Sequence, residues 1–206
     1  MSFTRRTIIA ATFGGLVISP VIAAPTFAAD AAKPQAVYQE YVLGNPKSKV
    51  TVIEYASLTC PHCAHFQEEE YPKLKAAYID TNKIKYIYRD FPLDGLATGA
   101  ALLARCAPNG RGITMVDLMF KNQNEWTRAE QPLVPLKNYA KLAGMDEADV
   151  DSCLKNQPML KEIQNVQEKA VTLYKVQGTP TFFVNEQLVE GVDFDTLKVA
   201  IDKQLK

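Results

Sequence analysis

The chain has 206 residues, of which 47% are hydrophobic and 22% charged, with 23 basic and 23 acidic side chains. This balance argues against a strongly basic surface, so we do not expect nucleic acid or an anionic membrane to be the main partner. The length suffices for one substantial hydrophobic core and leaves room for an inserted subdomain.

The first 28 residues have the pattern of an export signal. Arg5 and Arg6 form a basic region, residues 7–22 form an apolar run, and Thr26-Phe27-Ala28 offers small residues for cleavage. The paired arginines fit both a Sec signal and a twin-arginine signal. An uncleaved membrane anchor is the alternative, but glycine and proline interrupt the apolar run. We therefore expect a signal peptide at residues 1–28 and a periplasmic protein.

Removal of this signal leaves 21 basic and 23 acidic side chains and no other apolar run long enough to span a membrane. All four cysteines, Cys60, Cys63, Cys106 and Cys153, lie in the exported part, where disulfides persist. Four cysteines allow three pairings, so their number alone does not fix the connectivity.

Residues 29–93 predict a β-α-β unit behind a short leader. The expected elements are an edge strand, a buried strand, an amphipathic helix and a second central strand, at residues 37–43, 50–55, 61–79 and 83–89. Pro72 falls inside the helix and predicts a kink there.

From residue 94 to residue 176 the hydrophobic period is helical, which predicts an all-helical insertion. Turns containing proline or glycine divide it into five expected helices, near residues 95–107, 112–122, 132–143, 147–155 and 158–175. Asp146 is an expected N-cap. Residues 177–206 return to two short strands and a final helix, so the fold class is α/β with a helical insertion.

Cys60-Pro61-His62-Cys63 is the strongest functional signal in the chain. It lies between the buried strand and the amphipathic helix, where a C-x-x-C pair is typical of a redox site. Cys60 is expected at the helix N-cap, with Pro61 at the first helical position, where its missing N–H costs nothing. Unpaired N–H groups and the helix dipole should favour a Cys60 thiolate, and a protonated or donating His62 would add to this. Cys63 is the expected resolving thiol.

A stabilised thiolate sets the direction of the reaction. Each unit by which the pKa of Cys60 lies below the ambient pH favours the reduced dithiol by about 1.4 kcal/mol, or about 30 mV for a two-electron couple. A stabilised dithiol makes the corresponding disulfide a stronger oxidant. We therefore expect the Cys60–Cys63 disulfide to be donated to other proteins.

These residues resemble the DsbA family of periplasmic thiol:disulfide oxidoreductases. The resemblance rests on the segments EYASLTCPHC (54–63) and GTPTFFV (178–184), with the helical insertion between them, and it extends over essentially the whole mature chain. It implies a thioredoxin fold, formed by residues 29–93 and 177–206, with an inserted all-helical subdomain at residues 94–176. It also implies that Cys60 is the exposed nucleophile and Cys63 its buried partner.

The resemblance assigns roles to three further residues. Pro180 would be the cis-proline that faces the disulfide, and Thr179 would pair with substrate through its backbone. The alternative is that Thr179-Pro180 forms an ordinary turn with a trans peptide bond. Glu54 matches the family's buried acid and would assist proton transfer, unless it lies on the solvent face of its strand. Several members of the family have valine in the place of Thr179, and threonine there also occurs in disulfide isomerases. The oxidising strength is therefore left open.

Cys106 and Cys153 both fall in the helical insertion. Because two free thiols would be a liability in an oxidising compartment, we expect a disulfide between them, as in a branch of the DsbA family with a second, non-catalytic disulfide. Two separate buried thiols that act as small hydrophobic side chains are the alternative.

The expected function is dithiol oxidation of reduced, folding secreted proteins, without a cofactor, a metal or nucleic acid. The expected partner for reoxidation is a membrane quinone-linked thiol oxidase. A monomer is expected because the 17 residues between the cleavage site and Pro46 are too few for an oligomerisation module. An isomerase or reductase with the same site is one alternative. A zinc-binding or chaperone-like module is another, since C-x-x-C serves as half a zinc site if Cys106, Cys153 or His65 converges on it.

Overall fold

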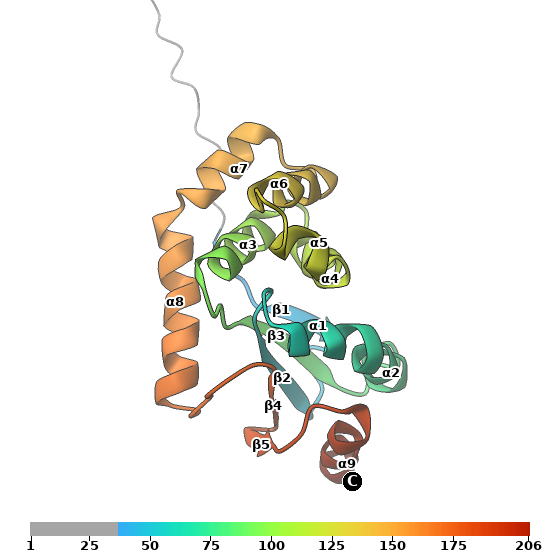
Figure 1. The fold of residues 1–206 in the computed structure, drawn as a ribbon. Helices are drawn as coiled ribbons and strands as arrows, with labels where there is room; N and C mark the ends of the chain where they lie inside the picture. Colours follow the sequence, from blue (N-terminus) through green and yellow to red (C-terminus); the bar gives the residue numbers. More distant parts are fainter. Residues whose placement is uncertain (1–36) are drawn as a thin grey trace, which may run out of the picture. The chain divides into compact units, whose positions relative to one another are not determined.

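A five-stranded sheet positions the Cys60–Cys63 motif in the computed structural model, which describes residues 37–206 (Figure 1). The strands lie in the order β1-β3-β2-β4-β5 and comprise Tyr41–Gly44 (β1), Thr51–Ala56 (β2), Lys85–Asp90 (β3), Thr181–Val184 (β4) and Gln187–Val189 (β5). β2 and β3 are parallel, and the other neighbouring pairs are antiparallel. The expected α/β class is confirmed. The signal peptide expected at residues 1–28 lies outside the described residues.

β2 and β3 form the buried centre of the sheet. A parallel pair is usually covered on both faces, which fits the largely apolar sequence of β2 and the three buried apolar residues in the middle of β3. Glu54 interrupts the apolar sequence of β2, where it lies opposite Tyr88 of β3 and Phe182 of β4. The loop that follows the carboxyl end of β2 carries Cys60, so the motif is anchored on the most buried strand pair.

The helix after Cys60 has four segments: α1 (Pro61–His65), the π-helical η1 (Phe66–Glu70), α2 (Tyr71–Leu74) and the π-helical η2 (Lys75–Ile79). The kink predicted at Pro72 rests on its missing N–H and on the collision of its ring with the carbonyl one turn earlier. The structure widens the helix just before this proline, since η1 ends at Glu70. The wider turn relieves the collision, so the chain stays helical through Pro72.

Six helices lie between β3 and β4 in the chain: α3 (Gly95–Cys106), α4 (Gly112–Lys121), α5 (Gln123–Thr127), α6 (Leu133–Leu142), α7 (Glu147–Leu154) and α8 (Gln157–Thr172). Figure 1 shows α3–α7 gathered above the sheet, while α8 leads back toward β4. Asp146 caps α7 in a capping box, as its sequence position predicts. α5 was not predicted, because its five residues follow α4 so closely that they show no period of their own.

The two faces of the sheet bury different sets of side chains. On one face, Tyr55 and Phe183 pack against Ala170 of α8. The other face packs against the helix of the motif, α4 and α9 (Phe194–Leu205), in a larger cluster that includes Cys60 and Cys63. The redox pair therefore belongs to the main core. The expected subdomain boundaries at residues 94 and 176 stay predictions.

Arg105 of α3 connects the helical insertion to the sheet from inside the core. Its Nε donates to Asp90 at the end of β3 over 2.6 Å, and its guanidinium carbon lies 4.3 Å from the ring centroid of Tyr38 and 3.7 Å from that of Tyr41. A buried charge is strongly unfavourable unless it is paired. The ion pair therefore fixes α3 against the end of the strand next to β2.

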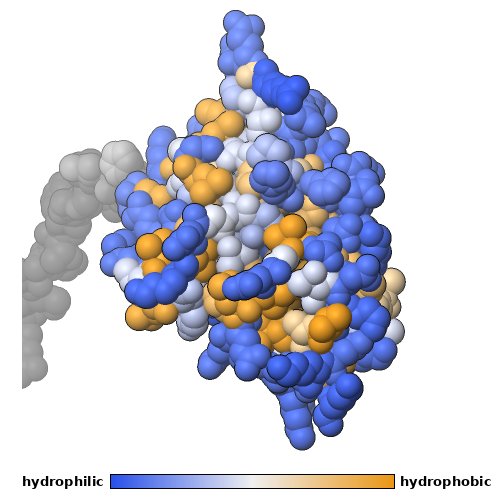
Figure 2. Space-filling view, turned by 60° about the horizontal axis from the view of Figure 1, so that its bottom comes forward, coloured by the Kyte–Doolittle hydropathy of each residue, from blue (hydrophilic) through white to orange (hydrophobic). Residues whose placement is uncertain are grey.

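Exposed apolar side chains on the last strand, the loop after it and the last helix include Leu188, Val192, Val199 and Leu205. Figure 2 brings this end of the molecule forward and shows hydrophobic areas bordered by hydrophilic residues. Within residues 37–206, no helix is both long enough and apolar enough to cross a membrane.

A disulfide joins Cys106 at the end of α3 to Cys153 in α7, with 6.1 Å between the two Cα atoms. The alternative of two separate buried thiols is therefore wrong. The bridge spans 47 residues of sequence and ties the first helix of the insertion to α7, the helix before α8.

Replacing Cys106 and Cys153 together by alanine should lower the free energy of unfolding by about 4 kcal/mol, because the open chain regains the entropy that a loop of this length removes. Chemical denaturation of the double variant and the wild type measures the difference. After mild reduction of the folded wild type, alkylation in denaturant should label only Cys60 and Cys63. Labelling of all four cysteines at low reductant would contradict a stable bridge.

Candidate active site

Cys60 lies at the N-terminus of α1, in the position expected from the sequence. It is the N-cap residue, with φ −79° and ψ 119°, and Pro61 occupies the first turn. Its side chain is 5% exposed, and its Sγ donates to the Thr179 carbonyl over 3.2 Å. Cys63, one turn further on, is fully buried. The expectation of an exposed Cys60 is therefore wrong: both cysteines are buried, and Cys60 is the one that keeps a small exposed surface.

Hydrogen bonds to the sulfur lower the pKa of Cys60 to about 5. The largest contribution comes from the Cys63 thiol, and further ones come from Thr179 and from the backbone N–H groups of Cys63 and His62, against the opposing effect of burial. The Thr179 hydroxyl oxygen is buried and has no partner in the described residues while Cys60 is a thiol. It is therefore available to donate to the thiolate. At neutral pH, Cys60 is an anion.

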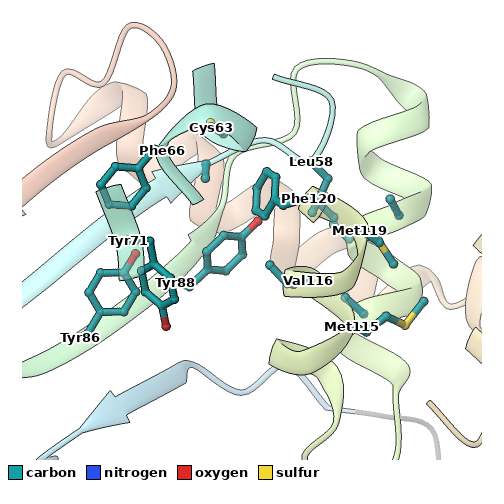
Figure 3. Packing of buried hydrophobic residues seen from close by; sticks show 14 of the residues in the cluster. Leu58, Cys63, Phe66, Tyr71, Tyr86, Tyr88, Met115, Val116, Met119 and Phe120 are labelled. Carbon is teal, nitrogen blue, oxygen red and sulfur yellow. The ribbon is translucent and has the colours of Figure 1, made fainter. Parts of the chain in front are cut away.

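The surroundings of Cys63 have the opposite effect. Burial is the main cause that raises the pKa of its thiol, and the neighbouring Cys60 and Glu54 raise it further. Figure 3 shows Cys63 and Phe66 on one side of the rings of Tyr71, Tyr86 and Tyr88, at the interface with α4. Cys63 is held as a thiol because its thiolate would have neither water nor a positive charge nearby.

The Thr179–Pro180 peptide bond is cis, and it lies across the site from Cys60 although the two are 119 residues apart in sequence. The Thr181 hydroxyl donates to the Gly178 carbonyl over 2.7 Å and closes the loop on itself. The alternative of an ordinary trans turn is wrong. Because β4 pairs with β2, the sheet itself brings Thr179 and Cys60 together.

Glu54 is completely buried below the motif, so the alternative that it faces solvent is wrong. The Tyr86 hydroxyl donates to its Oε2, and the Gln67 amide donates to the same oxygen over 3.3 Å. Burial raises the pKa of Glu54 to about 8, the Tyr86 hydrogen bond opposes this, and the charge of Asp117 adds to it. Gln67 and Asp117 also line a cavity of about 390 Å³ between the helix that follows Cys60 and α4.

His62 contributes to the site through its backbone N–H, while its side chain is exposed. The zinc alternative required Cys106, Cys153 or His65 to meet the motif. Cys106 and Cys153 are bonded to each other instead. In the described part of the chain, no three histidine, cysteine or acidic side chains come together in a way that could hold a metal ion.

Two contacts around Cys60 were not predicted from the sequence. The Gln123 amide on α5 donates to the carbonyls of Leu58 and Cys60, and the Thr59 hydroxyl donates to Asp94 at the start of α3. Both join the loop before Cys60 to the helical insertion. No sequence signal marks them, because each partner lies at least 35 residues away and belongs to no motif.

Comparisons with known proteins agree with this geometry. A family described as thioredoxin matches residues 37–203. A relative from Rickettsia conorii, described as a protein-disulfide oxidoreductase, is 34% identical over 81% of this chain and 61% of its own. A disulfide bond formation protein D of Bacillus cereus is 30% identical over 80% of this chain and 78% of its own. The solved structure of Wolbachia pipientis alpha-DsbA1 is 28% identical, with a TM-score of 0.75 over 84% of this chain and 94% of that one.

Fold and site together define a thioredoxin-fold protein with a C-x-x-C pair at the mouth of a helix, and the expected thioredoxin fold with a helical insertion is confirmed. Within that class, the chain belongs to the DsbA family. The chain spans less than two thirds of the length of the Rickettsia relatives, at 61% of one and 65% of another.

Replacing Glu54 by glutamine should change how stability depends on pH. In the folded protein the pKa of Glu54 is about 8, against 4.5 for an ordinary glutamate, so the folded state binds more protons than the unfolded state between these values. The free energy of unfolding therefore falls as pH rises through this window, by up to about 1.4 kcal/mol per pH unit. The Glu54→Gln variant should lose this contribution.

Denaturant unfolding of the oxidised protein at several values between pH 5 and pH 8 measures the effect without interference from Cys60, which does not titrate as a disulfide. Glu69→Gln is a matched control, because Glu69 is an exposed acid on the helix that follows Cys60. Its pH dependence should match the wild type. Identical slopes for the wild type and Glu54→Gln would contradict a buried, neutral Glu54.

Proposed function

We propose that this protein is a thiol:disulfide oxidoreductase that donates the Cys60–Cys63 disulfide to reduced, folding secreted proteins. The observation that carries the proposal is that the structure shifts the pKa values of the two cysteines in opposite directions. Hydrogen-bond donors surround Cys60 and lower its pKa to about 5, whereas burial raises the pKa of Cys63. Lowering the pKa of Cys60 stabilises the dithiol relative to the disulfide, which makes the pair a stronger oxidant of other thiols.

The reaction begins with the oxidised protein. A substrate thiolate attacks Sγ of Cys60, the Cys60–Cys63 bond breaks, and the electron pair of that bond leaves on Cys63. The Cys63 thiolate then takes up a proton, which Glu54 can supply while it is protonated below about pH 8. A second substrate thiolate attacks the substrate sulfur of the mixed disulfide and releases Cys60 as a thiolate. The substrate has lost two electrons and gained a disulfide, and the protein is a dithiol.

The driving force follows from the thiolate. A pKa of about 5 lies two units below neutral pH, which corresponds to roughly 60 mV in favour of the dithiol. Thr179 supplies part of this through its hydroxyl, in a position where several family members have valine. Threonine in this position also occurs in disulfide isomerases, so an isomerase with the same site is the second candidate.

Recognition of substrate is expected to be shallow and to depend on the main chain. The Thr179 backbone lies beside Cys60, and Pro61 and His62 are exposed next to it. An extended segment of an unfolded protein can pair with the backbone at Thr179 while its cysteine reaches Cys60. Such a surface accepts many sequences, as a general oxidant of folding proteins requires.

The proposal places the protein in the periplasm as a monomer, exported by its first 28 residues. A membrane quinone-linked thiol oxidase would restore the disulfide after each cycle. The description of the Bacillus cereus relative as a disulfide bond formation protein supports a role in forming disulfides.

The cysteine variants separate the roles of the two sulfurs. With oxidised glutathione, Cys63→Ser should accumulate a stable mixed disulfide at Cys60, because no second thiol can release it. Cys60→Ser leaves only the buried Cys63 and should react more than about 100-fold more slowly, because that sulfur is neither ionised nor accessible. Mass spectrometry follows both adducts. Equal labelling of the two variants would contradict the assignment.

The wild type should oxidise a reduced, unfolded protein at one disulfide per molecule, and both variants should be inactive in this assay. Incubation with a scrambled protein that contains several disulfides distinguishes the two candidate functions. Efficient reshuffling without added oxidant would favour the isomerase.

A further inference from the structure

Gln123 is the only side chain of the helical insertion whose amide contacts the backbone of Cys60, among the contacts of residues 37–206. It lies in the first turn of α5 and is 6% exposed. Its Nε2 donates to the Leu58 carbonyl over 2.8 Å and to the Cys60 carbonyl over 3.0 Å. One amide group thus holds the residue that bears the reactive sulfur and the residue two positions before it.

These two carbonyls determine where the sulfur points. The Cys60 carbonyl accepts the first hydrogen bond of the helix, from the Ala64 N–H over 3.1 Å, so its direction sets the start of α1. The side chain of Cys60 leaves from the same residue toward the N–H groups of His62 and Cys63, which lower its pKa. A rotation of this peptide would move the sulfur away from its donors.

The same amide also acts electrostatically. A carbonyl oxygen carries partial negative charge, and the carbonyls of Leu58 and Cys60 lie within two residues of the sulfur. A donated N–H compensates that charge where water is largely excluded. Without the amide, the Leu58 carbonyl would lose its only donor among the described hydrogen bonds. Both effects make a negative sulfur more favourable.

A second contact joins the insertion to the loop before Cys60. The Thr59 hydroxyl donates to Oδ2 of Asp94 over 2.7 Å, and Oδ1 of Asp94 accepts the Ala97 N–H as the cap of α3. The segment from Leu58 to Cys60 is therefore fixed between the starts of α3 and α5. Its geometry depends on the insertion as well as on the strand before it.

We propose that Gln123 is a positioning residue for the Cys60 thiolate, and that through it the helical insertion sets the reactivity of the redox pair. The inference deepens the proposed function and rests on it for its consequence in catalysis. The ionisable groups of the motif, Cys63 and His62, and the Asp94 that holds Thr59 stay unchanged when Gln123 is replaced. A change in the sulfur then reports the loss of the amide.

Gln167 provides a matched control. It is also a glutamine of the insertion, on α8, and its Nε2 donates to the Pro92 carbonyl over 2.8 Å. Replacing either glutamine by leucine removes one side-chain amide from a loop carbonyl. Only Gln123→Leu removes it from the loop that carries Cys60.

In Gln123→Leu, the pKa of Cys60 should rise by about half a unit to one unit, and the equilibrium constant for reduction by glutathione should fall about threefold to tenfold. Gln167→Leu should leave both quantities at the wild-type values. Ultraviolet absorbance of the thiolate gives the first quantity, and redox titration gives the second. Gln123→Met, with a flexible apolar chain of similar length, should reproduce the shift if the leucine variant folds poorly.

No change in either quantity in Gln123→Leu and Gln123→Met would overturn the inference. An equal change in Gln167→Leu would also overturn it, because the cause would then be a general loosening of the fold. If the wild type fails to oxidise a reduced protein, the proposed function fails instead. The comparison of the Cys60 pKa between variants still decides the role of Gln123 in that case.

Discussion

The sulfur of Cys60 must be held as an anion at the first turn of α1, and much of the surrounding structure serves this requirement. The N-cap position directs backbone N–H groups at the sulfur, and the cis peptide at Pro180 brings Thr179 against it. These contacts come from the loop after β2 and the loop before β4, which meet at the same end of this antiparallel strand pair. The fold matters for the chemistry because it assembles donors around one atom.

Burial determines the protonation state of the other two groups of the site, Cys63 and Glu54. Cys63 and Glu54 lie in the same core below Cys60, and burial disfavours the charged form of each. Both groups therefore favour the protonated form, which suits a reaction in which Cys63 alternates between a disulfide and a thiol. The same burial makes Glu54 unfavourable for stability at high pH, so the site carries a cost that the apolar core around it must offset.

The motif and the elements around it could be predicted from the sequence because their signals are local. Cys60, Pro61 and Cys63 between a strand and a helix define the redox site, and Asp146 marks the start of its helix. The Glu54–Tyr86 hydrogen bond, the Arg105 ion pair and the Gln123 amide could not be predicted, since each depends on how distant elements pack. The π-helical segments around Pro72 were missed for a related reason, because the proline indicates a disturbance without its form.

The most direct test of this account is an ultraviolet titration of the thiolate in the protein with the Cys60–Cys63 pair reduced and the Cys106–Cys153 bridge intact. A single thiolate should form with a midpoint near pH 5, and it should be absent in Cys60→Ser. A midpoint near pH 8 or above, where an ordinary cysteine ionises, would mean that the helix mouth gives no stabilisation. The disulfide would then have no excess oxidising power, and the account would be wrong.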